Sequence, residues 1–222
     1  MMATVVVDTG VVSIPEWVKG VDTFRHWLDV GGLPEKARTW FLNGEVWVDM
    51  SKEQIFTHVD LKGEITTVLR GLVKAAKLGR LLPDGALLTH PDTGLSGNPD
   101  AIFLSAATLV SDRIRLVAGK DGGFVELEGT PDMVLEVVSD SSEKKDNQIL
   151  VEAYWAAGIP EYWVVDARGK DIEFTVFRRA AKKYTRTREQ DGWVKSAVFG
   201  KEFRLTRAAD PQGNPEFTLA VR

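Results

Sequence analysis

The strongest constraint on the fold of this chain is a nearly continuous apolar run, residues 133–138, that contains a single charged residue, Glu136. A short apolar run bounded by turn residues is typical of a central strand that is covered on both faces. Residues 143–157 then have the pattern of a helix, which Gly158 closes in the C-cap position. A second apolar run, residues 162–165, follows. This part of the sequence therefore predicts a strand, a helix and another strand.

A long helix and two more strands are predicted upstream. Ser51 to Gln54 fits a capping box, in which a hydroxyl and an amide satisfy the first free N–H groups of a helix. The helix should end near Gly79, because apolar residues recur at three- and four-residue spacing before that point. Apolar stretches at residues 86–89 and 101–104 are bounded by turn residues and indicate strands. The resulting order of helix, three strands, helix and strand predicts an α/β fold with a mixed central sheet.

The N-terminal part of the chain predicts an accessory segment. Asn43-Gly44 stands between two alternating runs, residues 38–42 and 45–49. This pair is a strong hairpin signal, since both central residues of a type I′ turn need a positive φ. We therefore expect residues 1–50 to contain a β-hairpin and to pack on a core domain formed by residues 51–222.

Composition excludes several classes of protein. The 222 residues include no cysteine and three scattered histidines, so disulfides, thiolate zinc sites and cysteine nucleophiles are excluded. No apolar run approaches the roughly 20 residues needed to cross a bilayer, and the N-terminus lacks the features of a secretion signal. We therefore expect a cytoplasmic protein with no membrane partner. Any metal should be held by carboxylates, whose oxygens select hard cations such as Mg²⁺ or Mn²⁺.

The C-terminal part combines alternating strands with a basic stretch. Alternation in residues 173–177 and again around 203–205 predicts an antiparallel extension. Residues 167–188 hold eight basic and two acidic side chains, a local balance of +6 in a chain whose net charge is −4. This stretch is expected either to lie along a DNA backbone and bind it in a salt-dependent way, or to form a charged edge that discourages aggregation. The residues expected to contact DNA are Arg178, Arg179, Lys182 and Lys183.

Acidic residues in or beside the apolar strands are the best candidates for chemistry. A buried glutamate such as Glu136 is costly unless a metal, a hydrogen-bond donor or a cation compensates it, and its ordinary partner would be an Arg or Lys at a strand end. Asp132 lies four residues earlier on the same strand, roughly 13 Å away, so these two cannot share an ion. Asp100, which follows Pro99 at the start of a neighbouring strand, could face Glu136 at about 5 Å. That separation suits two carboxylates on one Mg²⁺, and we expect this pair to form the site.

Three longer motifs occupy residues 97–100, 129–142 and 158–166, and two single residues, Asp146 and Tyr154, belong with them. Together they closely resemble the Uma-type family of restriction-endonuclease-like proteins. The resemblance runs from about residue 37 to the C-terminus. The resemblance implies the PD-(D/E)xK nuclease fold, whose helix, three strands, helix and strand agree with the order deduced above. It also implies that Asp100 is the first metal-binding aspartate and Glu136 the acidic residue of the (D/E)xK element. Glu64, on the long helix, is similar to the helix glutamate that often completes such sites. A solvated glutamate is its ordinary alternative.

The lysine of the family motif is missing. It would fall two residues after Glu136, where this chain has Val138, and the alternative lysine of the following helix would fall at Leu150. A lysine there would orient the attacking water or stabilise charge on the phosphate. Lys144 and Lys145, at the start of that helix, are close enough in sequence to approach the site instead.

The resemblance implies a metal-dependent endonuclease that hydrolyses DNA phosphodiester bonds through a water activated by Mg²⁺ or Mn²⁺. The missing lysine leaves open a catalytically degenerate module of the same fold that binds nucleic acid or protein. A third hypothesis is a metal-free hydrolase that uses two carboxylates as acid and base, for example on a glycoside. Many nucleases of this fold act as dimers, so the resemblance also implies a homodimer.

Overall fold

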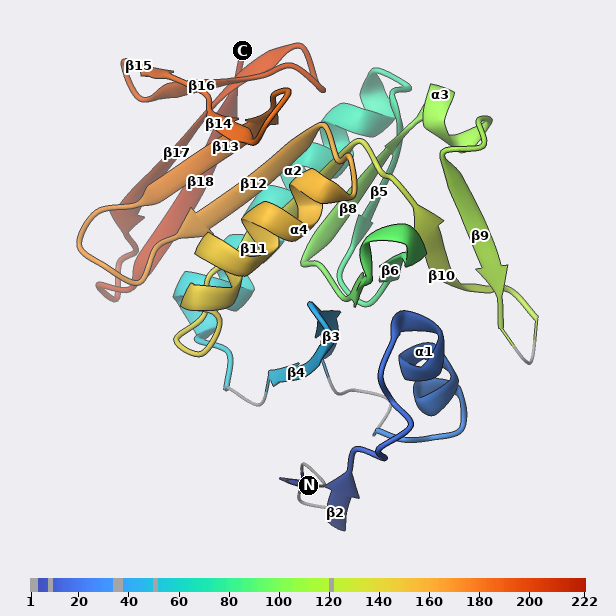
Figure 1. Cartoon of the computed structure of the whole chain (residues 1–222). Coiled ribbons are helices and arrows are strands. Elements are labelled where there is room, and N and C mark those ends of the chain that lie inside the picture. The colour runs from blue at the N-terminus through green and yellow to red at the C-terminus, as the bar shows by residue number, and fades with distance from the viewer. Residues whose placement is uncertain (1–3, 8–9, 34–37, 50–51, 120–121) are drawn as a thin grey trace.

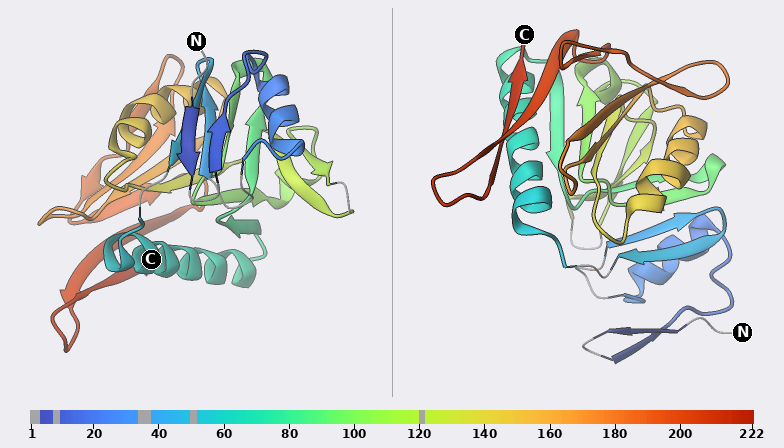
Figure 2. Two further views of the ribbon diagram at one scale, coloured as in Figure 1. Left: turned by 90° about the horizontal axis from the view of Figure 1, so that it is seen from below. Right: turned by 90° about the vertical axis from the view of Figure 1, so that its left-hand side faces the viewer.

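The computed structural model of the chain describes residues 4–7, 10–33, 38–49, 52–119 and 122–222. Within these ranges the strands form four sheets, two of which have six strands each (Figures 1 and 2). None of the helices in this part of the chain is long and apolar enough to cross a membrane.

The central sheet has the strand order β14-β13-β12-β11-β8-β5. Its strand β11 pairs in parallel with β12 and antiparallel with β8, so the sheet is mixed, as predicted. The strands are β5 (Gly79–Pro83), β8 (Ala101–Ser105), β11 (Met133–Val137), β12 (Glu161–Asp166), β13 (Glu173–Arg179) and β14 (Tyr184–Arg186).

Two helical segments cover opposite faces of the central sheet (Figures 1 and 2). One is α2 (Leu61–Ala75), which continues from a π-helical turn, η1 (Ile55–Asp60). The other is α4 (Leu150–Ala156), which continues from a second π-helical turn, η3 (Lys145–Ile149). Because side chains alternate along a strand, β11 contributes to the cores on both faces.

A second six-stranded sheet packs on the α4 side, in the order β4-β3-β7-β6-β10-β9. Its strands are β3 (Arg38–Leu42), β4 (Glu45–Asp49), β6 (Leu87–His90), β7 (Leu95–Gly97), β9 (Ile114–Ala118) and β10 (Phe124–Gly129). The short helices beside it are α1 (Val21–Asp29), η2 (Pro91–Thr93) and α3 (Ala106–Leu109).

The C-terminal extension is antiparallel, as predicted, and packs against α2. Its strands are β15 (Glu189–Gln190), β16 (Trp193–Ser196), β17 (Lys201–Ala209) and β18 (Pro215–Val221). At the other end, β1 (Thr4–Val7) and β2 (Gly10–Ser13) form a separate antiparallel hairpin.

The Asn43-Gly44 hairpin is confirmed, with φ angles of 53° and 83° at the two turn residues. Its first strand, β3, also pairs with β7, so the hairpin is built into the second sheet. The domain boundary near residue 50 stays a prediction, and Ser51 of the expected capping box lies outside the described residues.

The assignment of the three core strands needs one correction. The strand predicted at residues 86–89 is β6, which belongs to the second sheet, and the place beside β8 is taken by β5. Residues 79–83 show no alternation of apolar and polar side chains, and the predicted helix end at Gly79 covered the first residue of β5. Gly79 lies in β5 with a φ of 146°, and a Cβ there would stand 2.0 Å from the carbonyl oxygen of Leu104. Only glycine therefore permits this close pairing.

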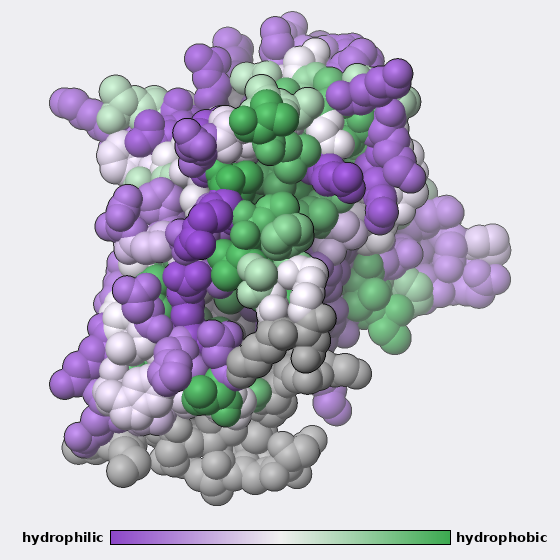
Figure 3. Space-filling model, turned by 90° about the vertical axis from the view of Figure 1, so that its right-hand side faces the viewer, coloured by the Kyte–Doolittle hydropathy of each residue, from purple (hydrophilic) through white to green (hydrophobic). Residues whose placement is uncertain are grey.

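The face that carries α3, β9 and β10 shows a stripe of apolar side chains (Figure 3). Strand β9 is an edge of the second sheet, and its neighbourhood leaves Val110, Leu116, Phe124 and Val125 exposed.

Candidate active site

Asp100 stands immediately before β8 and is buried, with 2% of its surface exposed. The antiparallel register pairs Ala101 with Leu135, which places Asp100 beside Glu136 of β11. One carboxylate oxygen, Oδ2, accepts a hydrogen bond of 2.8 Å from the backbone N–H of Val137. The pairing of β8 with β11 thus brings the two predicted acids to one place.

Glu136 is 3% exposed on the face of β11 that meets α4. The hydroxyl of Tyr154 donates to its Oε1 at 2.8 Å, and the Nζ of Lys145 lies 4.0 Å from its Oε2. Burial raises the pKa of this carboxyl well above the usual range, and the neighbouring Asp146 and Asp100 add to the rise while Lys145 opposes it. Without a further cation, the protonated form of the Glu136 carboxyl therefore persists to a higher pH than that of an exposed glutamate.

Lys145 and Asp146 occupy the first positions of η3, and both are buried. The Lys145 ammonium contacts the Asp146 carboxylate directly and lies 4.5 Å from the ring centre of Trp40. Burial lowers the pKa of Lys145, but the Glu136 and Asp146 carboxylates outweigh this effect, so the net shift is upward. Because the ammonium stays charged, Lys145 is a fixed cation in the site. Ser142 donates a hydrogen bond to Asp146 and helps to hold this pair.

Two more cations reach Asp100 from outside β8 and β11. Arg38 Nη1 lies 3.1 Å and Lys62 Nζ 3.3 Å from its Oδ1. Both also contact Asp84, at 2.9 Å and 3.1 Å, and Arg38 Nη2 lies 2.8 Å from Glu53. The Asp100 carboxylate is therefore neutralised by protein cations.

A small cavity with a volume of about 10 Å³ lies between Asp100 and Glu136 and the residues around them. That is roughly the room for one water molecule. His58 of η1 also lines it, and its Nε2 lies 3.9 Å from Asp100 Oδ2. The cavity is lined by both carboxylates of the predicted pair and by Arg38, His58, Lys145 and Asp146.

The structure does not bring Glu64 to this cavity. Its Oε1 accepts a hydrogen bond of 2.8 Å from the backbone N–H of Leu219 in β18, on the other side of α2. Lys62, two positions earlier on α2, faces Asp100. Residues two positions apart on a helix do not share a face, so Glu64 points elsewhere. Asp132 is also separate, since its carboxylate accepts bonds from the Ser105 N–H and the Thr108 hydroxyl.

The two lysines predicted to approach the site lie in different environments. Lys144 is exposed, whereas Lys145 is buried beside Glu136. Val138 and Leu150, at the positions of the missing motif lysines, are fully buried in the apolar core next to α4. The predicted DNA-binding residues Arg178, Arg179, Lys182 and Lys183 are exposed around the β13–β14 hairpin.

Sequence reasoning missed Arg38, His58 and Lys62 as site residues. Lys62 lies on the same face of the helix as the buried Leu69 and Val73. A charged residue on an apolar helix face is unusual, and this feature of the sequence could have marked Lys62 as a site residue. Arg38 and His58 stand far from Asp100 in sequence, and no local pattern marks them. Asp146 belongs to the family motif, but the sequence assigns it no role.

The side chains around the cavity include ligand atoms that suit a divalent cation. Asp100 and Glu136 offer buried carboxylate oxygens, which are the ligands that Mg²⁺ and Mn²⁺ prefer. No group of three or more histidine or acidic side chains able to hold an ion occurs among the described residues. The chemistry therefore fits an ion held by two carboxylates with water in the rest of its shell, in competition with Arg38, Lys62 and Lys145.

A mixed α/β fold, with two buried acids from neighbouring strands and a buried lysine from the following helical turn, agrees with the PD-(D/E)xK-like class that the sequence motifs imply. The chain belongs to the Uma2 family, described as "Putative restriction endonuclease", whose profile matches residues 21–208. This finding confirms the resemblance deduced from the sequence motifs.

One solved structure supports the fold independently. The chain is similar to the crystal structure of "a putative nuclease belonging to DUF820" from Anabaena variabilis, with a TM-score of 0.60 and 18% identity. The match covers 82% of this chain and 90% of that one. No curated protein matches the chain.

Proposed function

We propose that the protein is a metal-dependent endonuclease that hydrolyses DNA phosphodiester bonds. The observation that carries this proposal is the convergence of Asp100, Glu136 and Lys145 on one buried cavity in a chain of this family. The succession α2, β5, β8, β11, α4 and β12 also supports a restriction-endonuclease-like core of helix, three strands, helix and strand.

Asp100 and Glu136 would hold Mg²⁺ or Mn²⁺, which when bound polarises the scissile phosphate and lowers the pKa of a bound water. The Tyr154 hydroxyl orients the Glu136 carboxyl, and Asp146 fixes the ammonium of Lys145. Lys145 is the catalytic cation of this proposal, because its charge would stabilise the negative charge that develops on the phosphate.

The proposed DNA surface is the β13–β14 hairpin with its exposed cations. Arg168, from the same basic stretch, forms ion pairs with Asp166 at 2.7 Å and Glu143 at 2.9 Å and so is less available to phosphates. The exposed residues of this surface are Arg178, Arg179, Lys182 and Lys183.

The test is cleavage of supercoiled plasmid and of single-stranded DNA with Mg²⁺, with Mn²⁺ and with EDTA. The unmodified protein should cut only when metal is present, and Glu136→Gln should not cut. Cleavage that survives in EDTA would overturn the metal-dependent mechanism and favour the metal-free hydrolase. Full cleavage by a folded Glu136→Gln variant would remove this site from consideration.

A second candidate is a degenerate module that binds nucleic acid or protein without cutting. It is favoured by the apolar burial of Val138 and Leu150 and by the cations that already neutralise Asp100. Such a module predicts no rise in the melting temperature with Mg²⁺ or Mn²⁺, whereas a metal-binding nuclease predicts a concentration-dependent rise. The homodimer implied by the family also remains a proposal, which light scattering would test.

A further inference from the structure

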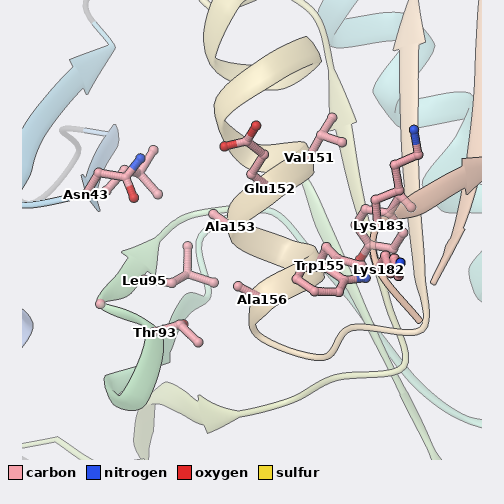
Figure 4. Close-up of a pocket in the computed structure, with 13 residues that line it drawn as sticks. Asn43, Thr93, Leu95, Val151, Glu152, Ala153, Trp155, Ala156, Lys182 and Lys183 are labelled. Carbon is pink, nitrogen blue, oxygen red and sulfur yellow. The ribbon is translucent and has the colours of Figure 1, made fainter. Parts of the chain in front are cut away.

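A separate pocket of about 560 Å³ lies beside helix α4 (Figure 4). This volume is within the range of small-molecule sites, roughly 300 to 1,000 Å³. Four segments form it: the β3–β4 turn, the η2–β7 connection, helix α4 and the β13–β14 hairpin. None of its lining residues lines the small cavity around Asp100 and Glu136.

The lining of the pocket is mainly apolar and includes two lysines. Figure 4 shows the α4 side chains between Asn43 and Leu95 on one side and the hairpin lysines on the other. Lys182 and Lys183 are both exposed, and a single acid, Glu152, lies among the lining residues. The apolar and aromatic part includes Leu42, Leu95, Val151, Ala153, Trp155 and Ala156.

Trp155 is held in place as a flat wall of this pocket. Its indole Nε1 donates to the carbonyl oxygen of Ala180 at 2.9 Å, which ties α4 to the hairpin. The Arg179 guanidinium lies 5.2 Å from the ring centre, and its Nε donates to the Trp155 carbonyl at 3.0 Å. A fixed aromatic ring beside lysines suits a ligand that has a flat ring and a negative charge, and a nucleotide has both.

Two elements connect the pocket with the active site. Strand β3 carries Arg38 at one end and Leu42 at the other, roughly 13 Å apart. The helical segment that starts with Lys145 reaches Val151 after roughly 9 Å and Ala156 after roughly 17 Å. A DNA strand covers such distances with about three to five nucleotides.

We propose that this pocket takes up an unpaired base of the DNA strand, while Lys182 and Lys183 contact the adjacent phosphates. This inference rests on the proposed function, since it assigns DNA as the ligand. It adds that binding depends on the bases of a single strand and not on backbone charge alone. A paired base is stacked inside the duplex and cannot enter without being flipped out.

The experiment compares two fluorescently labelled single strands of equal length and charge, one with normal bases and one made of abasic residues. Binding is measured by fluorescence anisotropy in EDTA, so that cleavage does not interfere. The strand with bases should bind roughly 5- to 100-fold more tightly, as expected for one stacked base. Equal affinities would overturn the proposal.

Ala156→Trp tests whether this pocket is the cause of the preference. Ala156 is exposed and lines the pocket, so a tryptophan there would fill the space without disturbing the core. The variant should lose the preference for bases and keep its affinity for the abasic strand. A preference that persists in a folded Ala156→Trp variant would overturn the assignment to this pocket.

The lysines are tested with a matched pair of double variants. Lys182→Gln with Lys183→Gln should weaken the binding of both strands, whereas Lys195→Gln with Lys201→Gln should not. The second pair is equally exposed and removes the same charge, but lies on the C-terminal sheet. Equal loss in both pairs would overturn the role of the hairpin lysines.

Plasmid cleavage by the unmodified protein separates this inference from the proposed nuclease. Metal-dependent cleavage together with equal binding of the two strands would overturn the pocket assignment alone. Base-dependent binding that Ala156→Trp abolishes, without any cleavage, would support the pocket and overturn the nuclease.

Discussion

The Nζ of Lys145 lies 4.0 Å from Oε2 of Glu136, although Lys145 belongs to η3 and not to strand β11. Both side chains are buried, and the ammonium also contacts Asp146. Val138, at the motif position two residues after Glu136, is buried among apolar side chains. The cation of the site therefore comes from the helical turn that follows β11.

Lys145→Met should reduce metal-dependent DNA cleavage by about 100-fold or more, because it removes the cation that faces the phosphate in the proposed site. Lys144→Met is the matched control, since the neighbouring lysine is exposed and outside the cavity. Initial rates on supercoiled plasmid would measure both. Equal rates for the two variants would show that Lys145 takes no part in the chemistry.

Glu136→Gln should raise the melting temperature in EDTA at pH 8. The folded-state pKa of Glu136 is raised, so its contribution to stability is full below the unfolded-state pKa and is lost as the pH rises toward the folded-state value. Glutamine is neutral at every pH and can still accept the Tyr154 hydrogen bond, so the variant avoids this loss.

Melting curves from pH 5 to pH 9 would measure this effect, with a gain of about 2 to 4 °C for each kcal/mol in a chain of this size. Glu173→Gln removes an exposed glutamate and serves as the control. A difference between Glu136→Gln and the unmodified protein that does not grow with pH would contradict the prediction.

Arg38→Met should lower the melting temperature in EDTA and increase the additional stabilisation by Mg²⁺. Arg38 neutralises Asp100, Asp84 and Glu53, and without it these carboxylates leave a negative site that a divalent cation can occupy. Arg80→Met is the control, because Arg80 is exposed on β5. Thermal unfolding with and without Mg²⁺ measures both effects, and an Mg²⁺ response equal to that of the unmodified protein would refute the competition.

Replacing all four cations of the β13–β14 hairpin by glutamine should reduce the salt dependence of DNA binding. Loss of four phosphate contacts lowers the slope of log K against log salt by roughly 3. The slope is obtained from anisotropy titrations at several salt concentrations. An unchanged slope would place the DNA surface elsewhere. The residues replaced are Arg178, Arg179, Lys182 and Lys183.

The sequence by itself determined the elements whose signals are local. The apolar run around Glu136 became β11, and Asn43-Gly44 became the predicted turn with positive φ at both residues. The family motifs also fixed Asp100 and Glu136 as candidates, and the antiparallel register of β8 and β11 placed them together. Such features depend on neighbouring residues or on one strand pair, which a linear pattern can represent.

Only the tertiary structure decided which other side chains reach the site. Glu64 and Lys62 stand two positions apart on α2, and the packing of that helix sends the first to β18 and the second to Asp100. Arg38 arrives from a hairpin that joins the second sheet, and β5, not β6, completes the core sheet. These outcomes depend on the rotation of helices and the order of strands, which are set by contacts between residues far apart in the chain.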